Sequence, residues 1–125
     1  MALHIDIGGE GRYAGAWNVN PARSTSTTGT PGRPIPRLIQ ALGEALPFAD
    51  ASVARVTVEN APIRPGTVAE IARVLAPGGE VHLLHPIDYA IQCGAHDAVA
   101  GALRIDAGET VRSIVGDMAR TVLYR

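Results

Sequence analysis

The segment that decides the fold is residues 46–79, which read LPFADASVARVTVENAPIRPGTVAEIARVLAPGG. Its apolar and β-branched run, Val53–Val58, predicts a strand. Apolar residues at helical spacing predict a helix after that strand: Val68, Ile71, Ala72 and Leu75. The turn at residues 77–79, Pro-Gly-Gly, ends the helix, and the near-continuous apolar run Val81–Leu84 is typical of a strand buried in a parallel sheet.

On the amino-terminal side, Leu3–Ile7 predicts a strand that runs into a glycine turn at Gly8–Gly11. A second short strand follows at Ala16–Val19. Eight residues separate the two predicted strands, which is fewer than a helical crossover between parallel strands needs. The two strands are therefore either antiparallel or joined by a bare loop that makes a parallel crossover.

Three further local features surround the central helix. Residues Asn20–Pro34 are rich in Pro, Gly, Ser and Thr, which is typical of a lid, a binding loop or a disordered excursion. Apolar spacing over Ile35–Leu42 predicts a short amphipathic helix. Thr67 followed by Glu70 predicts a capping box at the start of the central helix.

The carboxyl-terminal third of the sequence predicts helical segments followed by a β-hairpin. A helical stretch follows Pro86, is broken at Gly94 and resumes over Asp97–Leu103. Two alternating runs, Thr110–Val115 and Arg120–Tyr124, flank a Gly-Asp turn and predict a β-hairpin. The expected fold class is α/β: a Rossmann-like three-layer sandwich with a mostly parallel sheet and a carboxyl-terminal antiparallel hairpin.

Bulk properties narrow the function classes. The 125 residues fit one domain, spanning 1–125. A net charge of −1 with scattered arginines gives no strong nucleic-acid signal. No apolar run is long enough to span a membrane, and Cys93 is the only cysteine, so the expectation is a cytoplasmic domain without disulfides; a domain taken from a secreted protein has the same features.

The order of these motifs resembles the class I S-adenosylmethionine-dependent methyltransferase family. The resemblance rests on the Leu-Pro-Phe turn at residues 46–48, an acidic residue, a strand, and a helix that ends in Arg-Val-Leu-x-Pro-Gly-Gly at residues 73–79. The opening Ile5-Asp6-Ile7-Gly8-Gly9 is similar to small members of the family whose first crossover is short. The resemblance implies an S-adenosylmethionine cofactor and a methyltransferase activity.

The resemblance also implies a set of cofactor-binding residues. Asp6 and the glycines of the turn lie beside the amino-acid part of the cofactor, Asn20 lies near the ribose, and two apolar residues line the adenine face. The full set is Asp6, Gly8, Gly9, Gly11, Asn20, Leu46 and Phe48. Leu42 stands where the family has an acidic residue that contacts the adenine amine, and Glu44 is the nearest substitute.

Three residues are candidates for the catalytic side. Glu59 and Asn60 follow a strand, where the family has residues that face the substrate, and His85 at a strand end is a candidate general base. His82 and His85 are three apart on a strand and point to opposite faces, so no metal site is predicted.

Two other classes of function stay open, because the helix that normally follows the glycine turn is missing. One is a toxin-type effector domain that acts on NAD or another adenine nucleotide. The other is a non-catalytic oligomerisation or interaction module, since an open sheet leaves apolar surface that a homodimer or a partner chain covers.

Overall fold

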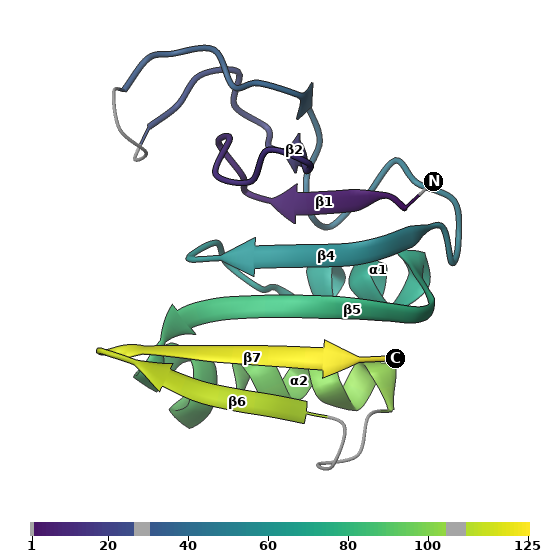
Figure 1. The fold of residues 1–125 in the computed structure, drawn as a ribbon, viewed down its shortest axis with the longest axis vertical. Helices are drawn as coiled ribbons and strands as arrows, with labels where there is room; N and C mark the ends of the chain where they lie inside the picture. Colours follow the sequence, from purple (N-terminus) through teal and green to yellow (C-terminus); the bar gives the residue numbers. More distant parts are fainter. Residues whose placement is uncertain (1, 27–30, 105–109) are drawn as a thin grey trace.

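A computed structural model describes residues 2–26, 31–104 and 110–125. The described part contains seven strands and three helical elements around one sheet (Figure 1). In chain order they are β1 His4–Ile7, β2 Trp17–Val19, β3 Leu38–Ile39, β4 Val53–Glu59, α1 Pro65–Val74, β5 Leu75–Pro86, the π-helical turn η1 Asp88–Gln92, α2 Ala95–Leu103, β6 Thr110–Val115 and β7 Met118–Tyr124.

The strands lie in the order β3-β2-β1-β4-β5-β7-β6. The first five are parallel, β7 is antiparallel to β5, and β6 and β7 form the predicted hairpin. β1 and β2 are parallel, with Ile5 beside Trp17, so the short crossover is a bare loop. The predicted class and the mostly parallel sheet with an antiparallel hairpin are confirmed.

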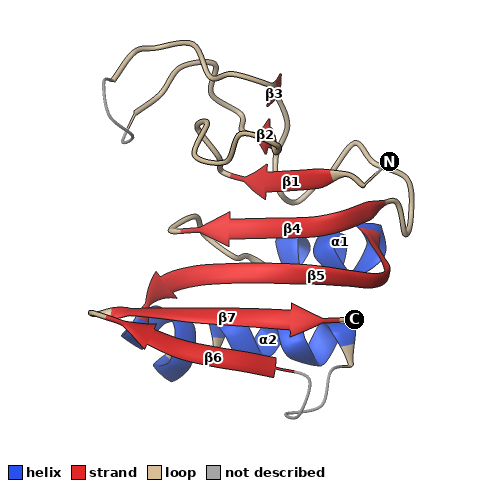
Figure 2. Ribbon diagram, viewed as in Figure 1, coloured by secondary structure: helices blue, strands red, loops and turns tan. Residues whose placement is uncertain are grey.

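The helices of the described residues are unevenly distributed over the two faces of the sheet. α1 and α2 contact each other and cover the same face of the sheet, which is the far face in Figure 2. No helix of the described residues covers the opposite face. The reason is the first crossover, which is too short to form a helix and crosses this open face as a loop.

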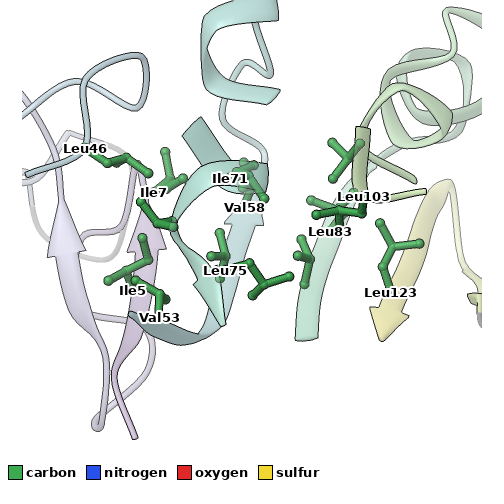
Figure 3. Packing of buried hydrophobic residues seen from close by; sticks show 14 of the residues in the cluster. Ile5, Ile7, Leu46, Val53, Val58, Ile71, Leu75, Leu83, Leu103 and Leu123 are labelled. Carbon is green, nitrogen blue, oxygen red and sulfur yellow. The ribbon is translucent and has the colours of Figure 1, made fainter. Parts of the chain in front are cut away.

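Strand alternation explains how one face is buried and the other is polar. In β4, Val56 and Val58 are fully buried on the helix side, whereas Arg55 and Glu59 are directed to the open face. Figure 3 shows the core between the sheet and α1, where Ile71 packs among strand residues such as Ile5. Burying each such side chain stabilises the fold by about 1.5–3 kcal/mol.

Arg73 ties together the two ends of the segment that decides the fold. Its guanidinium donates to the carbonyls of Leu46 at 2.9 Å and Phe48 at 2.8 Å. Glu70 accepts from the Leu46 N–H at 2.9 Å and from Arg73 Nε at 2.6 Å, and these bonds, the one from Arg73 foremost, lower the pKa of Glu70. The Leu-Pro-Phe turn and the helix therefore fold as one unit.

The predicted capping box of α1 is wrong. The helix begins at Pro65, with Arg64 at the cap position and no side-chain cap, because proline at the first position has no N–H to satisfy. Thr67 lies within the helix and is buried, and Glu70 binds Leu46 instead of the helix start.

The helix predicted over Ile35–Leu42 is also wrong. Two residues of this segment, Leu38 and Ile39, form β3 and pair with Asn18 and Val19. Pro36 disfavours helix for the residue before it, and the backbone groups that a helix would use bond to β2 instead. Within the preceding polar stretch, Ser24 bridges to Pro34, while residues 27–30 lie outside the described part.

The carboxyl-terminal elements follow the prediction. Gly94 adopts φ +73° and separates η1 from α2, as expected from the broken helical pattern. Gly116 adopts φ +64° in the two-residue turn between β6 and β7, where such a value favours glycine.

Candidate functional site

A cleft of about 230 Å³ opens at the carboxyl end of the parallel strands. Gly8 and Val19 line it from the ends of β1 and β2. The other walls come from the segments after β3 and β4, at Leu42–Glu44 and Ala61–Arg64, with Thr67 of α1 beside them. Open α/β sheets bind ligands at this edge, so the cleft is the primary candidate site.

Close packing within the chain requires each glycine of the turn. A Cβ on Gly8 would lie 2.7 Å from Ala61 Cβ, and one on Gly11 would lie 2.8 Å from Pro36. Both residues also have positive φ, +76° and +108°. Only Gly8 lines the cleft, so the others serve the turn itself.

Gly9 gives a direct test of this packing. A Cβ at this position would collide with Asn18 Oδ1 and lie 2.6 Å from the carboxylate carbon of Asp6. We expect Gly9→Ala to lower the free energy of unfolding by about 1–3 kcal/mol, as overpacking does. Chemical denaturation measures the change. Gly15→Ala is the matched control, because a Cβ added there would meet no atom within 4 Å and φ is not positive; equal losses in both variants would contradict the packing argument.

Beneath the turn, Arg12 lies between two carboxylates on the open face of the sheet. Its guanidinium donates to Asp6 Oδ1 at 2.9 Å and to the carbonyl of Glu59 at 3.1 Å, and pairs with Glu59 Oε2 at 3.1 Å. Asp6 is fully buried. Burial raises the pKa of Asp6, and the bonds from Arg12 oppose that rise. Tyr13 completes the cluster by donating to Glu59 Oε1 at 3.2 Å.

The other predicted cofactor residues lie apart from the cleft lining. Asn20 donates to the Gly9 carbonyl at 3.2 Å and accepts from the Ala22 N–H at 2.9 Å. Leu46 is buried in the core, and Phe48 packs against it. Leu42 and Glu44 line the cleft instead, and Glu44 pairs with Arg64 at 3.1 Å on the exposed rim.

The predicted catalytic residues are not gathered in one place. The Glu59 carboxylate is engaged by Arg12 and Tyr13. Asn60 is exposed at the end of β4, next to Ala61 of the cleft wall, with φ +57°. His85 is 2% exposed and lies behind that wall. These three therefore occupy three different environments.

His85 belongs to a buried hydrogen-bonded chain. His85 Nε2 lies 2.8 Å from the Ala61 carbonyl, which only accepts, so this nitrogen carries the proton. His85 Nδ1 then accepts from His96 Nε2 at 2.8 Å, and His96 Nδ1 accepts from the Thr121 hydroxyl at 2.7 Å. Both ring nitrogens of His85 are thus used internally, which leaves it without a free nitrogen for the general-base role expected of it.

A second hollow of about 230 Å³ lies on the open face. It is lined by polar side chains, among them His4, which bonds to Thr57 at 2.8 Å, and His82, which bonds to Glu80 at 2.9 Å. His82 and His85 point to opposite faces as predicted. Among the described residues no cluster of His, Cys, Asp or Glu could hold a metal ion, and no helix is long and apolar enough to cross a membrane.

Sequence reasoning missed both the cleft lining and the role of Arg12. The cleft residues Ala61 and Thr67 could have been found from their places after β4 and at the start of α1, since loops at the carboxyl edge line ligand sites. The pairing of Arg12 with Glu59 spans 47 residues and has no local signal in the sequence.

Comparison with known proteins finds solved structures with a similar fold. No family model matches the sequence, and no curated protein matches it significantly. Among solved structures, a T. thermophilus 16S rRNA methyltransferase in complex with AdoMet and guanosine has a TM-score of 0.62 at 14% identity, over 99% of this chain and 35% of that one. A 16S rRNA adenine methyltransferase from Catenulisporales acidiphilia, solved with SAM, has a TM-score of 0.59 at 12% identity, over 98% and 84%.

A third similar structure is a complex between the Haloferax volcanii Trm112 methyltransferase activator and a methyltransferase, with a TM-score of 0.55 at 17% identity, over 98% of this chain and 82% of that one. At these identities the likeness concerns the fold. The chain has the Rossmann-like fold of S-adenosylmethionine-dependent methyltransferases, which confirms at that level the resemblance seen in residues 46–79.

Proposed function

We propose that this chain, as one domain over residues 1–125, binds S-adenosylmethionine or its demethylated product in the edge cleft and serves a methyl transfer whose acceptor is unassigned. The observation that carries the proposal is the cleft itself. It lies at the carboxyl ends of β1, β2 and β4 in a methyltransferase fold, which is where such sheets bind ligands.

The cleft suits the nucleoside half of the cofactor. Its volume of about 230 Å³ is below the roughly 300–1,000 Å³ of common small-molecule sites, so it fits one half of the cofactor better than the whole molecule. Apolar Leu42 and Val19 can contact a base, and Glu44 offers a carboxylate that can accept from the adenine amine. Gly8 lets the backbone approach the ligand without a side chain in the way.

The turn leaves less open space for the amino-acid half of the cofactor. Asp6 is already neutralised by Arg12, and Gly9 and Gly11 pack against Asn18 and Pro36. In this proposal these residues hold the shape of the turn, and Gly8 alone of the turn contacts the cofactor. Asn20 keeps its amide bonded to the turn and supports the cleft from behind.

When bound, the cofactor supplies a methyl group on a sulfonium, which a nucleophile attacks in line. The chain's contribution is to hold the acceptor at the right distance and angle. Asn60 is the best placed of the predicted residues, because it is exposed and directly precedes Ala61 of the cleft wall. Glu59 acts through its ion pair with Arg12, and its role is to position the strand end.

Calorimetric titration with S-adenosylmethionine and its demethylated product tests the proposal. We expect both to bind, and Glu44→Gln to weaken binding by about tenfold, the effect of replacing a hydrogen bond to a charged carboxylate by one to a neutral amide oxygen. Glu80→Gln is the matched control, since Glu80 pairs with Arg55 on the open face away from the cleft. No binding at about 1 mM by a folded sample, or binding of ATP or NAD in place of S-adenosylmethionine, would overturn the proposal.

A further inference from the structure

Exposed apolar side chains concentrate on the carboxyl-terminal hairpin. Of the described residues, five large hydrophobic ones are exposed, and four of them lie on β6 and β7: Val111, Ile114, Val115 and Tyr124. Val111 and Val115 are 56% and 53% exposed. They lie on β6, which ends the strand order and forms the lower edge of the sheet in Figures 1 and 2. A free apolar edge strand is a template for pairing with another strand.

The features that usually protect an edge are weak in β6. The strand reads TVRSIV, with no proline and one charged residue, Arg112. That charge does not guard the edge, because the guanidinium is directed onto α2 and donates to Asp97 at 2.9 Å. Arg112 Nε also lies 3.4 Å from the Thr121 hydroxyl on the neighbouring strand. The edge therefore presents a regular, nearly uncharged six-residue strand.

We propose that two copies of this chain pair along β6, antiparallel and centred on Ser113, so that one sheet runs through both copies. A two-fold axis through the sheet keeps the same face of both copies on the same side, so paired residues must share a face. Centring on Ser113 places Val111 opposite the partner copy's Val115 on the open face, and Arg112 opposite the partner copy's Ile114 on the helix face.

This register joins apolar side chains that β7 has already aligned. Within the chain, Val111 lies opposite Val122, and Val115 lies opposite Met118. Pairing through Ser113 extends each of these pairs across the interface, so that two apolar rows flank a central polar row of Ser113 and Arg120. Cross-strand apolar pairs of this kind are the units that stabilise a sheet.

Other registers and occupants fit less well. Centring on Arg112 would put two guanidiniums directly opposite each other, which is unfavourable, and centring on Ile114 would place Val115 opposite serine. The valines, the neutralised arginine and the self-matching order of the strand favour a second copy over an unrelated peptide. The inference is independent of the cofactor proposal, because β6 lies across the sheet from the cleft.

Sedimentation of charge-substituted variants tests the register. We expect the wild type to form dimers at concentrations up to about 1 mM, and Val111→Lys or Val115→Glu alone to weaken dimerisation by about tenfold or more. The double variant Val111→Lys/Val115→Glu should recover most of the affinity, because the proposed register pairs each lysine with a glutamate of the partner. Leu42→Lys, at an exposed hydrophobic side chain outside the hairpin, is the control and should leave dimerisation unchanged.

Cross-linking provides a second measurement that does not depend on affinity. In a Cys93→Ser background, Ser113→Cys should form an intermolecular disulfide on oxidation, because directly opposed strand residues have the Cα spacing that disulfides need. Arg112→Cys should not, since it faces Ile114 of the partner. A monomeric wild type, a double variant no better than the single ones, or equal cross-linking at both positions would overturn the proposal.

Discussion

Replacing Arg12 with methionine is expected to lower the free energy of unfolding by about 3–5 kcal/mol, the cost of leaving a buried charge without its partner. Asp6 is fully buried, and the guanidinium of Arg12 is its ion-pair partner, with further bonds to Glu59. Methionine keeps the length and apolar stem of the side chain but offers no donor. Urea denaturation of the two proteins at pH 7 measures the difference.

Two further variants separate this effect from loss of packing. Asp6→Asn combined with Arg12→Met removes both charges and should recover much of the lost stability. Arg64→Met breaks the pair with Glu44, in which both side chains are exposed, and should cost no more than about 1 kcal/mol. If Arg12→Met is no more costly than Arg64→Met, the central role given to Arg12 is wrong.

The penalty of Arg12→Met should also depend on pH. Burial raises the pKa of Asp6 above its ordinary value, and removing Arg12 raises it further. A carboxyl whose folded-state pKa is raised favours the folded state when it is protonated, so its contribution to stability is lost as the pH rises through that folded-state pKa. The difference between variant and wild type should therefore shrink as the pH falls and Asp6 becomes protonated.

The ion-pair partners of Arg12 could not be predicted from the sequence. Its partners are Asp6 and Glu59, and the second lies on β4, so their meeting depends on the parallel pairing of β1 with β4. No spacing in the sequence encodes that pairing. Residues 46–79, in contrast, are stabilised by contacts within one unit, such as Arg73 to Leu46, and the strand and helix of that unit were predictable. The end of the helix was not, because α1 ends at Val74 and Leu75, predicted on its apolar face, begins β5.

The errors have physical causes of the same kind. Ile35–Leu42 has helical spacing, but Leu38 and Ile39 pair with β2 at the edge of the sheet, and this tertiary pairing prevails over the local pattern. Thr67 fits a capping pattern, yet proline at position 65 starts the helix earlier. The short β1–β2 crossover is the reason that one face of the sheet carries no helix in the described part of the chain.

For the site, the sequence located the edge but only part of its lining. Gly8, one of the expected cofactor residues, lines the cleft, and so does Glu44, the substitute for the missing acidic residue. Leu46 lies in the core and the partly buried Phe48 packs against that core, because the Arg73 network holds their segment against α1. Which apolar residues of a loop face the ligand and which face the core depends on such contacts, and the linear pattern is the same in both cases.

The buried imidazole pair leads to the second large effect, a loss of stability in mild acid. Burial, the nearby His85 and Arg112 lower the pKa of His96 to about 4, and burial lowers the pKa of His85 as well. Folded-state pKa values below the ordinary 6.5 mean that the unfolded chain takes up protons first as the pH falls. The stability contributed by the neutral pair is therefore complete above about pH 6.5 and is lost progressively as the pH falls from there toward 4.

For His96 alone the loss over this window is expected to reach about 3 kcal/mol, since each pKa unit corresponds to about 1.4 kcal/mol. Urea denaturation between pH 7 and pH 4 measures it, and imidazole NMR at pH 7 should show that both rings are neutral, with the proton of His85 on Nε2 facing Ala61. His96→Gln should flatten the profile. His82→Gln, on the opposite face, should retain it, because the bonded chain from Thr121 through His96 to His85 stays intact. Parallel profiles for the wild type and His96→Gln would show that the acid sensitivity arises elsewhere, and would remove the reason to treat the histidine pair as a neutral structural element behind the cleft wall.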